Sequence, residues 1–143
     1  IGDEDPAYKG GSYQFVQKYI HDMTAWNALP VSEQEKVIGR SKHDDIEMSE
    51  DEKPANSHSA IANIGDDFKV IRDNMPFGTV GNNELGTYFI CYASTFSTVQ
   101  KMLMNMFTGV DGANYDRLLD FSTAVTGTLF FVPTVDMLGD FAG

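Results

Sequence analysis

The stretch SYQFVQKYI, residues 12–20, predicts a β-strand, because it is rich in aromatic and β-branched residues and mixes polar with apolar positions. The glycine pair 10–11 precedes it as a turn. Two further strands are predicted over residues 68–74 and 86–93, separated by the turn-rich segment 76–83. The strands are therefore spread along the chain, with other elements between the first and the second.

A short helix is predicted after Pro30. Ser32 and Glu35 have the spacing of an S-x-x-E capping box, and Gly39 can end the helix. The polar stretch that follows, residues 42–53, contains six acidic residues, and we interpret it as a solvated loop. A surface Mn²⁺ or Ca²⁺ site is the alternative, but the spacing matches no cation-binding loop of the EF-hand type.

A longer helix begins at Ser97 or Thr98 and ends at Gly109. Its apolar residues recur at three- and four-residue spacing, as in a helix with one buried face: Val99, Met102, Leu103, Met106 and Phe107. A last helix is predicted from an Asn114 cap through residues 118–119. The order strand, helix, loop, strand, strand, helix, helix indicates an α+β, ferredoxin-like domain, with an antiparallel sheet and the helices on one face.

The composition limits the function classes. The chain of 143 residues has a formal net charge of -11, which disfavours nucleic acid as a partner. No apolar run approaches the roughly 20 residues that span a bilayer, so no membrane contact is expected. Cys91 is the one cysteine, which excludes an internal disulfide, and we interpret it as a small buried apolar residue. It fits a reducing compartment, and we expect cytoplasmic localisation.

Three places could carry chemistry. His58 has small neighbours that would let a flat group approach, whereas His21 and His43 are interpreted as solvated. Arg72 ends a predicted strand and would need an anionic partner if buried, either in a salt bridge or in a bound ligand. Asp116 and Asp120 are spaced four residues apart, so they would share one face of a helix. From local sequence alone, a structural role is the simpler interpretation of each.

Taken together, several stretches resemble the dye-decolourising peroxidases, in particular their bacterial branch. They follow in the family's order over essentially the whole chain: IGDEDP (1–6), GGSY (10–13), VQKYIHD (16–22), WNAL (26–29), VIGR (37–40), NSH (56–58), RDNMPFG (72–78), GTYFI (86–90), YDR (115–117) and FSTAVTG (121–127). Members of that family consist of two ferredoxin-like halves and carry haem b largely in the C-terminal half. The resemblance implies that residues 1–143 are this C-terminal, haem-binding half and that the N-terminal half is absent from this chain.

The resemblance also implies residue roles. His58 would bind the haem iron on the proximal side through Nε2, and either Asp116 or Asp120 would accept a hydrogen bond from its Nδ1–H. Arg72 would bind peroxide on the distal side, with Asn74 as a neighbouring polar group.

Apolar and polar wall residues follow from the same comparison. Thr87 and Phe89, which share one strand face, would line the distal pocket, and Met106, Phe107 and Leu118 would line the proximal one. Trp26 and Tyr115 are suggested as electron relays.

The activity implied is that of a haem peroxidase that reduces hydrogen peroxide with electrons from dyes, phenols or similar organic donors. We also expect the protein to form a homo-oligomer. The family's distal G-x-x-D-G segment should lie just before Ile1 and is not in this chain. Since the chain begins with Ile1 rather than Met, we expect it to start at an internal point of a longer polypeptide. The alternatives are a haem-binding or haem-handling protein without peroxidase turnover and a haem-free α+β structural domain.

Overall fold

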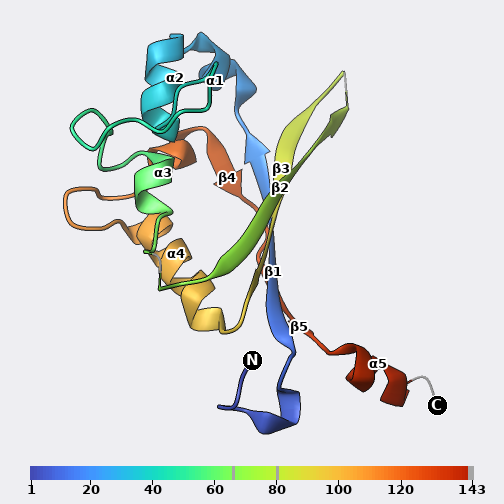
Figure 1. Ribbon diagram of the computed structural model, residues 1–143. Coiled ribbons are helices and arrows are strands. Elements are labelled where there is room, and N and C mark those ends of the chain that lie inside the picture. The colour runs from blue at the N-terminus through green and yellow to red at the C-terminus, as the bar shows by residue number, and fades with distance from the viewer. Residues whose placement is uncertain (66, 80, 142–143) are drawn as a thin grey trace.

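The computed structural model describes residues 1–65, 67–79 and 81–141. Its centre is a five-stranded antiparallel sheet in the order β2-β3-β1-β4, with β5 also paired to β1 (Figure 1). The strands are β1 (Ser12–His21), β2 (Val70–Thr79), β3 (Asn82–Ala93), β4 (Ser122–Ala124) and β5 (Thr128–Val132). The prediction of a strand over residues 12–20 is confirmed.

The short strands β4 and β5 occupy one edge of β1 in succession. β4 pairs with the end of β1 at Tyr19–His21, and β5 pairs with its beginning at Ser12–Val16. Together they take the place of a single fourth strand beside β1, so that the sheet has the strand order of a β-α-β-β-α-β unit. The predicted α+β, ferredoxin-like fold is confirmed.

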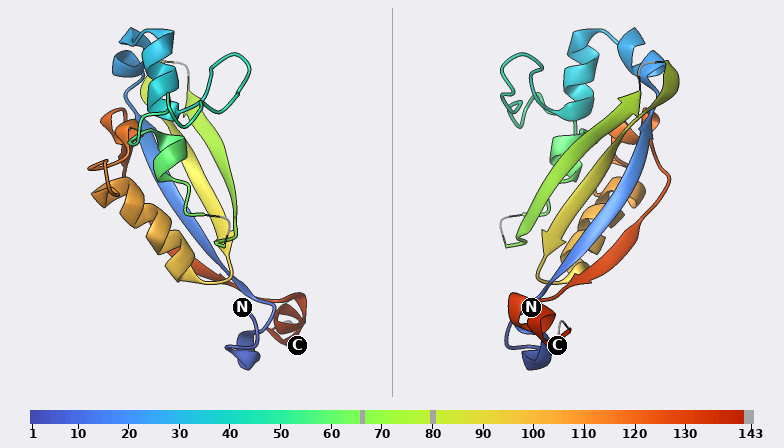
Figure 2. Two further views of the ribbon diagram at one scale, coloured as in Figure 1. Left: turned by 60° about the vertical axis from the view of Figure 1, so that its left-hand side comes forward. Right: turned by 90° about the vertical axis from the view of Figure 1, so that its right-hand side faces the viewer.

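Helices cover one face of the sheet. They are α1 (Met23–Ala28), α2 (Val31–Ile38), α3 (His58–Ile61) and α4 (Phe96–Thr108), followed by the 3-10 helix η2 (Arg117–Asp120). The 3-10 helix η1 (Pro6–Tyr8) and α5 (Val135–Phe141) lie near the two termini, at one end of the sheet (Figure 1). The right-hand view of Figure 2 looks onto the other face, and no helix of the described residues covers it. None of the described helices has the length and apolar character needed to cross a lipid bilayer.

The core lies between the sheet and α4. One cluster joins Phe15, Cys91 and Ala93 of the sheet to Val99 of α4. Cys91 is completely buried, and this burial raises the pKa of its thiol. Its interpretation as a small buried apolar residue is therefore confirmed. A second cluster joins α3 to α4 through Ile61, Met102, Met106 and Ala113.

Three local predictions were wrong. The capping box at Ser32 does not form, because α2 begins at Val31 after Pro30 and has no side-chain cap. The turn predicted from residue 76 onward begins later, since β2 runs on to Thr79. Pro76 is tolerated there because β2 is an edge strand, whose outer backbone groups need no partner strand.

The predicted last helix is the third error. Residues 117–120 form only a 3-10 turn, and the chain then pairs with β1 as β4. The Asp116 side chain, rather than Asn114, accepts the first free backbone N–H. The helix α3, by contrast, was not predicted, because a single helical turn leaves too little periodicity to detect.

The end of α2 fits closely against the start of α3 at Gly39. Gly39 has φ 85°, and a Cβ there would overlap Ser59 Oγ and lie 2.8 Å from Ser57 Oγ. Both the backbone conformation and the close approach therefore require glycine. This contact places the residue between the two serines, His58, at the inner side of the helical layer.

We predict that Gly39→Ala destabilises the domain more than Gly65→Ala. Gly65 has a similar φ of 90°, but a Cβ added to it would meet no atom within 4 Å. The loss of stability in Gly65→Ala therefore reports only the cost of placing an alanine in the left-handed backbone conformation, about 1–2 kcal/mol. Gly39→Ala adds overpacking worth about 1–3 kcal/mol. Urea unfolding followed by circular dichroism measures both, and equal losses would contradict the close contact.

Candidate functional site

A cavity of about 300 Å³ lies between the helix-covered face of the sheet and the layer formed by α3, α4 and η2. Its apolar wall consists of Ala62, Phe89, Met102, Leu103, Met106, Leu118 and Leu119. Its polar side chains are Tyr19, His21, His58, Arg72, Asn74, Thr87 and Ser122. A mostly apolar cavity with a few convergent polar groups is typical of a small-molecule or cofactor site.

His58, the first residue of α3, enters this cavity from the helical layer. Its Nδ1 lies 2.6 Å from Asp116 Oδ2, and the Asp116 side chain is completely buried while that of His58 is 32% exposed. The other carboxylate oxygen of Asp116 accepts the Leu118 backbone N–H at 2.9 Å. An Nδ1–H that donates to a carboxylate leaves the Nε2 lone pair of the imidazole available to a ligand.

The structure distinguishes the two carboxylates that the sequence left as alternatives. Asp120 is exposed and accepts a hydrogen bond from the Tyr115 hydroxyl at 2.9 Å, on the outer side of η2. Asp116 is the partner of His58. The backbone of Asp116 is fixed as well, because its N–H donates to the Met106 carbonyl at 2.8 Å, and the next N–H, of Arg117, donates to the Asn56 carbonyl.

Arg72 and Asn74 enter the cavity from the sheet, on alternate positions of β2. The Arg72 guanidinium approaches the Ala62 carbonyl at 3.4 Å and Met102 Sδ at 3.5 Å. Among the described residues no carboxylate pairs with it, so the simple salt-bridge interpretation is not supported. The cavity therefore contains a fixed positive charge without an anionic partner in the described chain.

The other predicted wall residues divide into two groups. Thr87, Phe89, Met106 and Leu118 all line the cavity. Phe107 does not: it is exposed on α4 and is not among the lining residues, so its prediction as a wall residue is corrected. The helical period explains the difference, because residues 102, 103 and 106 face the cavity while residue 107 lies further round the helix.

Sequence reasoning missed three residues of the sheet wall: Tyr19, His21 and Ser122. His21 was interpreted as solvated, but it lines the cavity and hydrogen-bonds on both ring nitrogens, to Ser122 Oγ at 2.8 Å and Thr87 Oγ1 at 2.7 Å. Tyr19 is buried beside it and donates to Gln17 Oε1 at 2.6 Å. Burial raises the pKa of Tyr19, and the Asp116 charge raises it further. The sequence signal that could have revealed Tyr19 and His21 is the alternation of side chains along a β-strand, which puts Gln17, Tyr19 and His21 on one face of β1.

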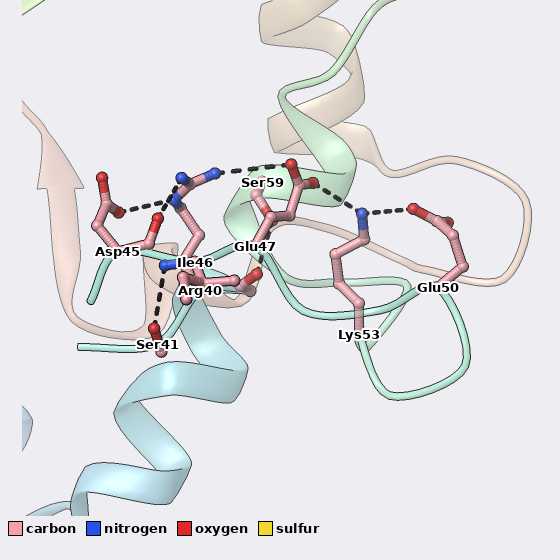
Figure 3. Close-up of polar contacts among 9 residues, drawn as sticks. Arg40, Ser41, Asp45, Ile46, Glu47, Glu50, Lys53 and Ser59 are labelled. Carbon is pink, nitrogen blue, oxygen red and sulfur yellow. Dashed lines mark hydrogen bonds and ion pairs between the residues drawn. The ribbon is translucent and has the colours of Figure 1, made fainter. Parts of the chain in front are cut away.

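The acidic loop of residues 42–53 is held to the domain by the cationic side chains of Arg40 and Lys53 (Figure 3). Arg40 Nε donates to Asp45 Oδ1 at 2.7 Å, and Lys53 Nζ lies 2.9 Å from Glu47 Oε1 and 2.8 Å from Glu50 Oε1. The other acidic side chains are exposed, which confirms the solvated loop, and His43 is exposed as predicted. Within the described residues, no three His, Cys, Asp or Glu side chains gather closely enough for a metal site.

A second cavity of about 410 Å³ extends the site toward this loop. It shares His58, Ala62, Arg72 and Met102 with the first cavity and is also lined by Arg40 and Glu47. A flat ligand held at His58 would therefore border both spaces.

Trp26 packs edge-on against Phe121 and borders a smaller hollow next to His21. The roles of Trp26 and Tyr115 as electron relays stay predictions.

Comparison with known proteins identifies this arrangement. The family model described as Dyp-type peroxidase, C-terminal, matches residues 1–137. The chain belongs to the Dyp-type peroxidase family. The predicted resemblance is thereby confirmed, and the description of the matching family model as C-terminal agrees with the prediction that the chain corresponds to the C-terminal part of such proteins.

Individual Dyp-type relatives are closely similar. The dye-decolorizing peroxidase of Rhodococcus erythropolis is 59% identical over 98% of this chain and 42% of its own length. The crystal structure of a dye-decolorizing peroxidase from Bacteroides thetaiotaomicron is 64% identical, with a TM-score of 0.96 over all of this chain and 46% of that chain. A variant of Rhodococcus jostii DypB, solved in complex with heme, is 55% identical over 96% of this chain and 46% of its own, with a TM-score of 0.90. The chain thus spans less than half the length of these relatives.

We predict that Asp116→Asn moves the His58 proton. The asparagine oxygen can still accept the Leu118 N–H, which turns its amide N–H toward Nδ1 and places the imidazole proton on Nε2. The imidazole ¹⁵N signals of the haem-free protein would then show the other tautomer, with a loss of about 1.5–3 kcal/mol of stability from the missing charged hydrogen bond. Asp120→Asn is the matched control and should leave both unchanged; an unshifted His58 tautomer in Asp116→Asn would contradict the assignment.

Proposed function

We propose that residues 1–143 form the C-terminal, haem-binding domain of a peroxidase that reduces hydrogen peroxide and oxidises dyes, phenols or similar organic donors. One observation carries this proposal. His58 is held by the buried Asp116 carboxylate with Nε2 left for a ligand, in an apolar cavity that also contains an arginine for which the described chain offers no carboxylate partner. Membership of the Dyp-type peroxidase family supports the same reaction.

The residues of the cavity fit haem b. Its ring is large, flat and apolar, and the aliphatic and sulfur-containing side chains from α4 and η2 offer a matching surface: Met102, Met106, Leu118 and Leu119. His58 is a neutral-imidazole ligand of the kind that iron accepts, with a carboxylate behind it. When bound, haem would supply the redox-active iron that passes electrons from the donor to peroxide. The heme complex of the Rhodococcus jostii DypB variant supports this choice of cofactor.

The chain's own residues have distinct tasks in this reaction. Asp116 orients the His58 ring, keeps its proton on Nδ1 and increases the electron donation of Nε2. Arg72 attracts the peroxide and stabilises the negative charge that develops as its O–O bond breaks. Phe89 and the leucines of η2 exclude water, which strengthens these electrostatic interactions. A haem carrier would need His58 but not a cation such as Arg72 in the cavity, so the arginine favours the peroxidase over the carrier.

We also propose that an N-terminal half packs on the uncovered face of the sheet. Large apolar side chains alternate onto this face and are exposed: Ile71, Met75, Tyr88, Tyr92 and Phe130. Ile71, on the edge strand β2, is 77% exposed, and with its neighbours it forms a large apolar patch of the kind that marks an interaction surface. Relatives that are more than twice as long as this chain have enough additional sequence to supply a covering domain. Assembly into a homo-oligomer and cytoplasmic localisation stay predictions.

We predict that His58→Ala abolishes or strongly weakens haem binding in the protein that carries this chain. Loss of the iron ligand should lower haem affinity by at least the 10- to 100-fold typical of changes around a metal ligand. Haem titration followed by the Soret absorption measures it, with the exposed His43→Ala as control. A wild-type protein without a Soret band after haem addition would reject the haem proposal.

We predict that Arg72→Ala keeps the Soret band but lowers peroxide-dependent dye oxidation about 10²–10³-fold, since it removes the group that stabilises developing charge. Steady-state oxidation of a dye by hydrogen peroxide is the measurement. Arg117→Ala is the matched control, because Arg117 pairs with Glu33 outside the cavity. Unchanged turnover in Arg72→Ala would contradict the role given to Arg72, whereas a haem-loaded wild type that does not oxidise the dye would favour the haem-carrier alternative.

A further inference from the structure

His21 is a titratable residue of the cavity wall that the proposed reaction has not used. It ends β1, the central strand, and its ring bridges the two neighbouring strands: Nδ1 to Ser122 Oγ on β4 at 2.8 Å and Nε2 to Thr87 Oγ1 on β3 at 2.7 Å. His21, Thr87 and Ser122 all line the cavity that contains His58 and Arg72. The three side chains thus form a continuous line of hydrogen bonds along the sheet wall.

We propose that His21 is the proton acceptor that this chain itself supplies to the cavity, with Thr87 as the relay between His21 and a bound hydrogen peroxide. This inference rests on the proposed function. The peroxide O–H donates to Thr87 Oγ1 while the Thr87 hydroxyl donates to His21 Nε2. Transfer of both protons along this line breaks the peroxide O–H bond, leaves hydroperoxide with the electron pair, restores the Thr87 hydroxyl and converts His21 to imidazolium.

The hydrogen bonds fit this direction of transfer. A neutral imidazole donates from one nitrogen and accepts at the other. With the proton on Nδ1, His21 donates to Ser122 Oγ and presents the Nε2 lone pair to Thr87. After transfer both nitrogens donate, and both hydroxyl oxygens can accept. No side chain has to move, which is the preorganisation that efficient proton transfer requires.

The surroundings of His21 keep it neutral and ready to accept a proton. Burial lowers the pKa of His21 below its ordinary value. The titratable or charged side chains that share the cavity wall are Tyr19 on β1, Arg72 on β2 and His58 on α3. In the neighbouring hollow on the side of α1 and η2, His21 is the only titratable side chain among the lining residues that the structure describes. Within the described part of the chain, no carboxylate is therefore placed to hold His21 as imidazolium, and a proton that it accepts can leave again.

Cyanide binding to the haem-loaded protein tests the relay without measuring turnover. Hydrogen cyanide, like peroxide, must lose a proton as it binds ferric haem, so its association rate reports on a proton acceptor. We expect His21→Gln and Thr87→Val each to slow association about 10- to 100-fold, within the range of general base catalysis. Thr87→Ser, which keeps the hydroxyl, should retain the wild-type rate.

Three controls separate this role from a structural one. His43→Gln makes the same chemical change on an exposed histidine and should have no effect. The double variant His21→Gln/Thr87→Val should be no slower than either single variant, because both residues act in one relay. In the haem-free protein, the His21 imidazole signal should titrate below pH 6.5 by NMR.

The outcomes are distinct. If wild type shows no Soret band, the proposed function fails. If all variants keep the band and His21→Gln or Thr87→Val binds cyanide at the wild-type rate, or Thr87→Ser is as slow as Thr87→Val, the relay is wrong. Additive losses in the double variant would also reject it. Slow association in His21→Gln and Thr87→Val, with recovery in Thr87→Ser, supports it.

Discussion

The buried Asp116 carboxylate is the constraint around which the site is built. Taking an unpaired carboxylate out of water costs several kcal/mol, so a completely buried one persists only when its oxygens are satisfied. Here one carboxylate oxygen of Asp116 accepts a hydrogen bond from His58, and the other accepts one from the Leu118 N–H. The backbone N–H of Asp116 donates to the Met106 carbonyl on α4. These contacts join α3, α4 and η2 into one helical layer. Orientation of the His58 ring is thus a consequence of how the domain satisfies its buried charge.

The opposite wall of the cavity follows from the geometry of the sheet. Side chains alternate along β-strands, so the residues of β1, β2 and β3 that face the helices do so in rows. The rows place Tyr19 opposite Thr87, Asn74 opposite Phe89 and Arg72 opposite Cys91. The same alternation sends Ile71 and Tyr92 to the uncovered face. The alternation of side chains along the strands therefore produces both the polar wall of the cavity and the apolar residues exposed on the uncovered face.

Charge is arranged so that the two walls have different chemistry. The helical side contributes an imidazole backed by a carboxylate, and the sheet side contributes a cation and a histidine that hydrogen-bonds two hydroxyls. Six of the other acidic residues lie in the loop of residues 42–53, which Arg40 and Lys53 hold against the domain (Figure 3). An overall acidic chain can thereby maintain a local positive charge at Arg72.

Local sequence was sufficient for the elements whose signal is periodic. The aromatic and β-branched residues of 12–20 predicted β1, and the three- and four-residue spacing of apolar residues predicted α4, together with its end at Gly109. From these the fold class followed, and the ordered stretches around His58 and Arg72 pointed to the family. The capping box at Ser32 and the helix after Asn114 failed, because a local pattern is only a weak preference that long-range pairing can override. The three residues of β4 form a strand because β1 offers them hydrogen-bond partners about a hundred residues away.

The sequence by itself therefore predicted three of the five strands and the main helix, since each depends on neighbours within a few residues, and the resemblance of its ordered stretches pointed to His58 as the candidate ligand. Only the tertiary structure decided that Asp116 rather than Asp120 holds His58, that Phe107 lies outside the cavity, and that His21 is inside it. The physical reason is the same in each case. A hydrogen bond such as that between His58 and Asp116 joins residues 58 positions apart, and burial is shared by elements that meet only after folding, so neither leaves a periodic trace in the chain.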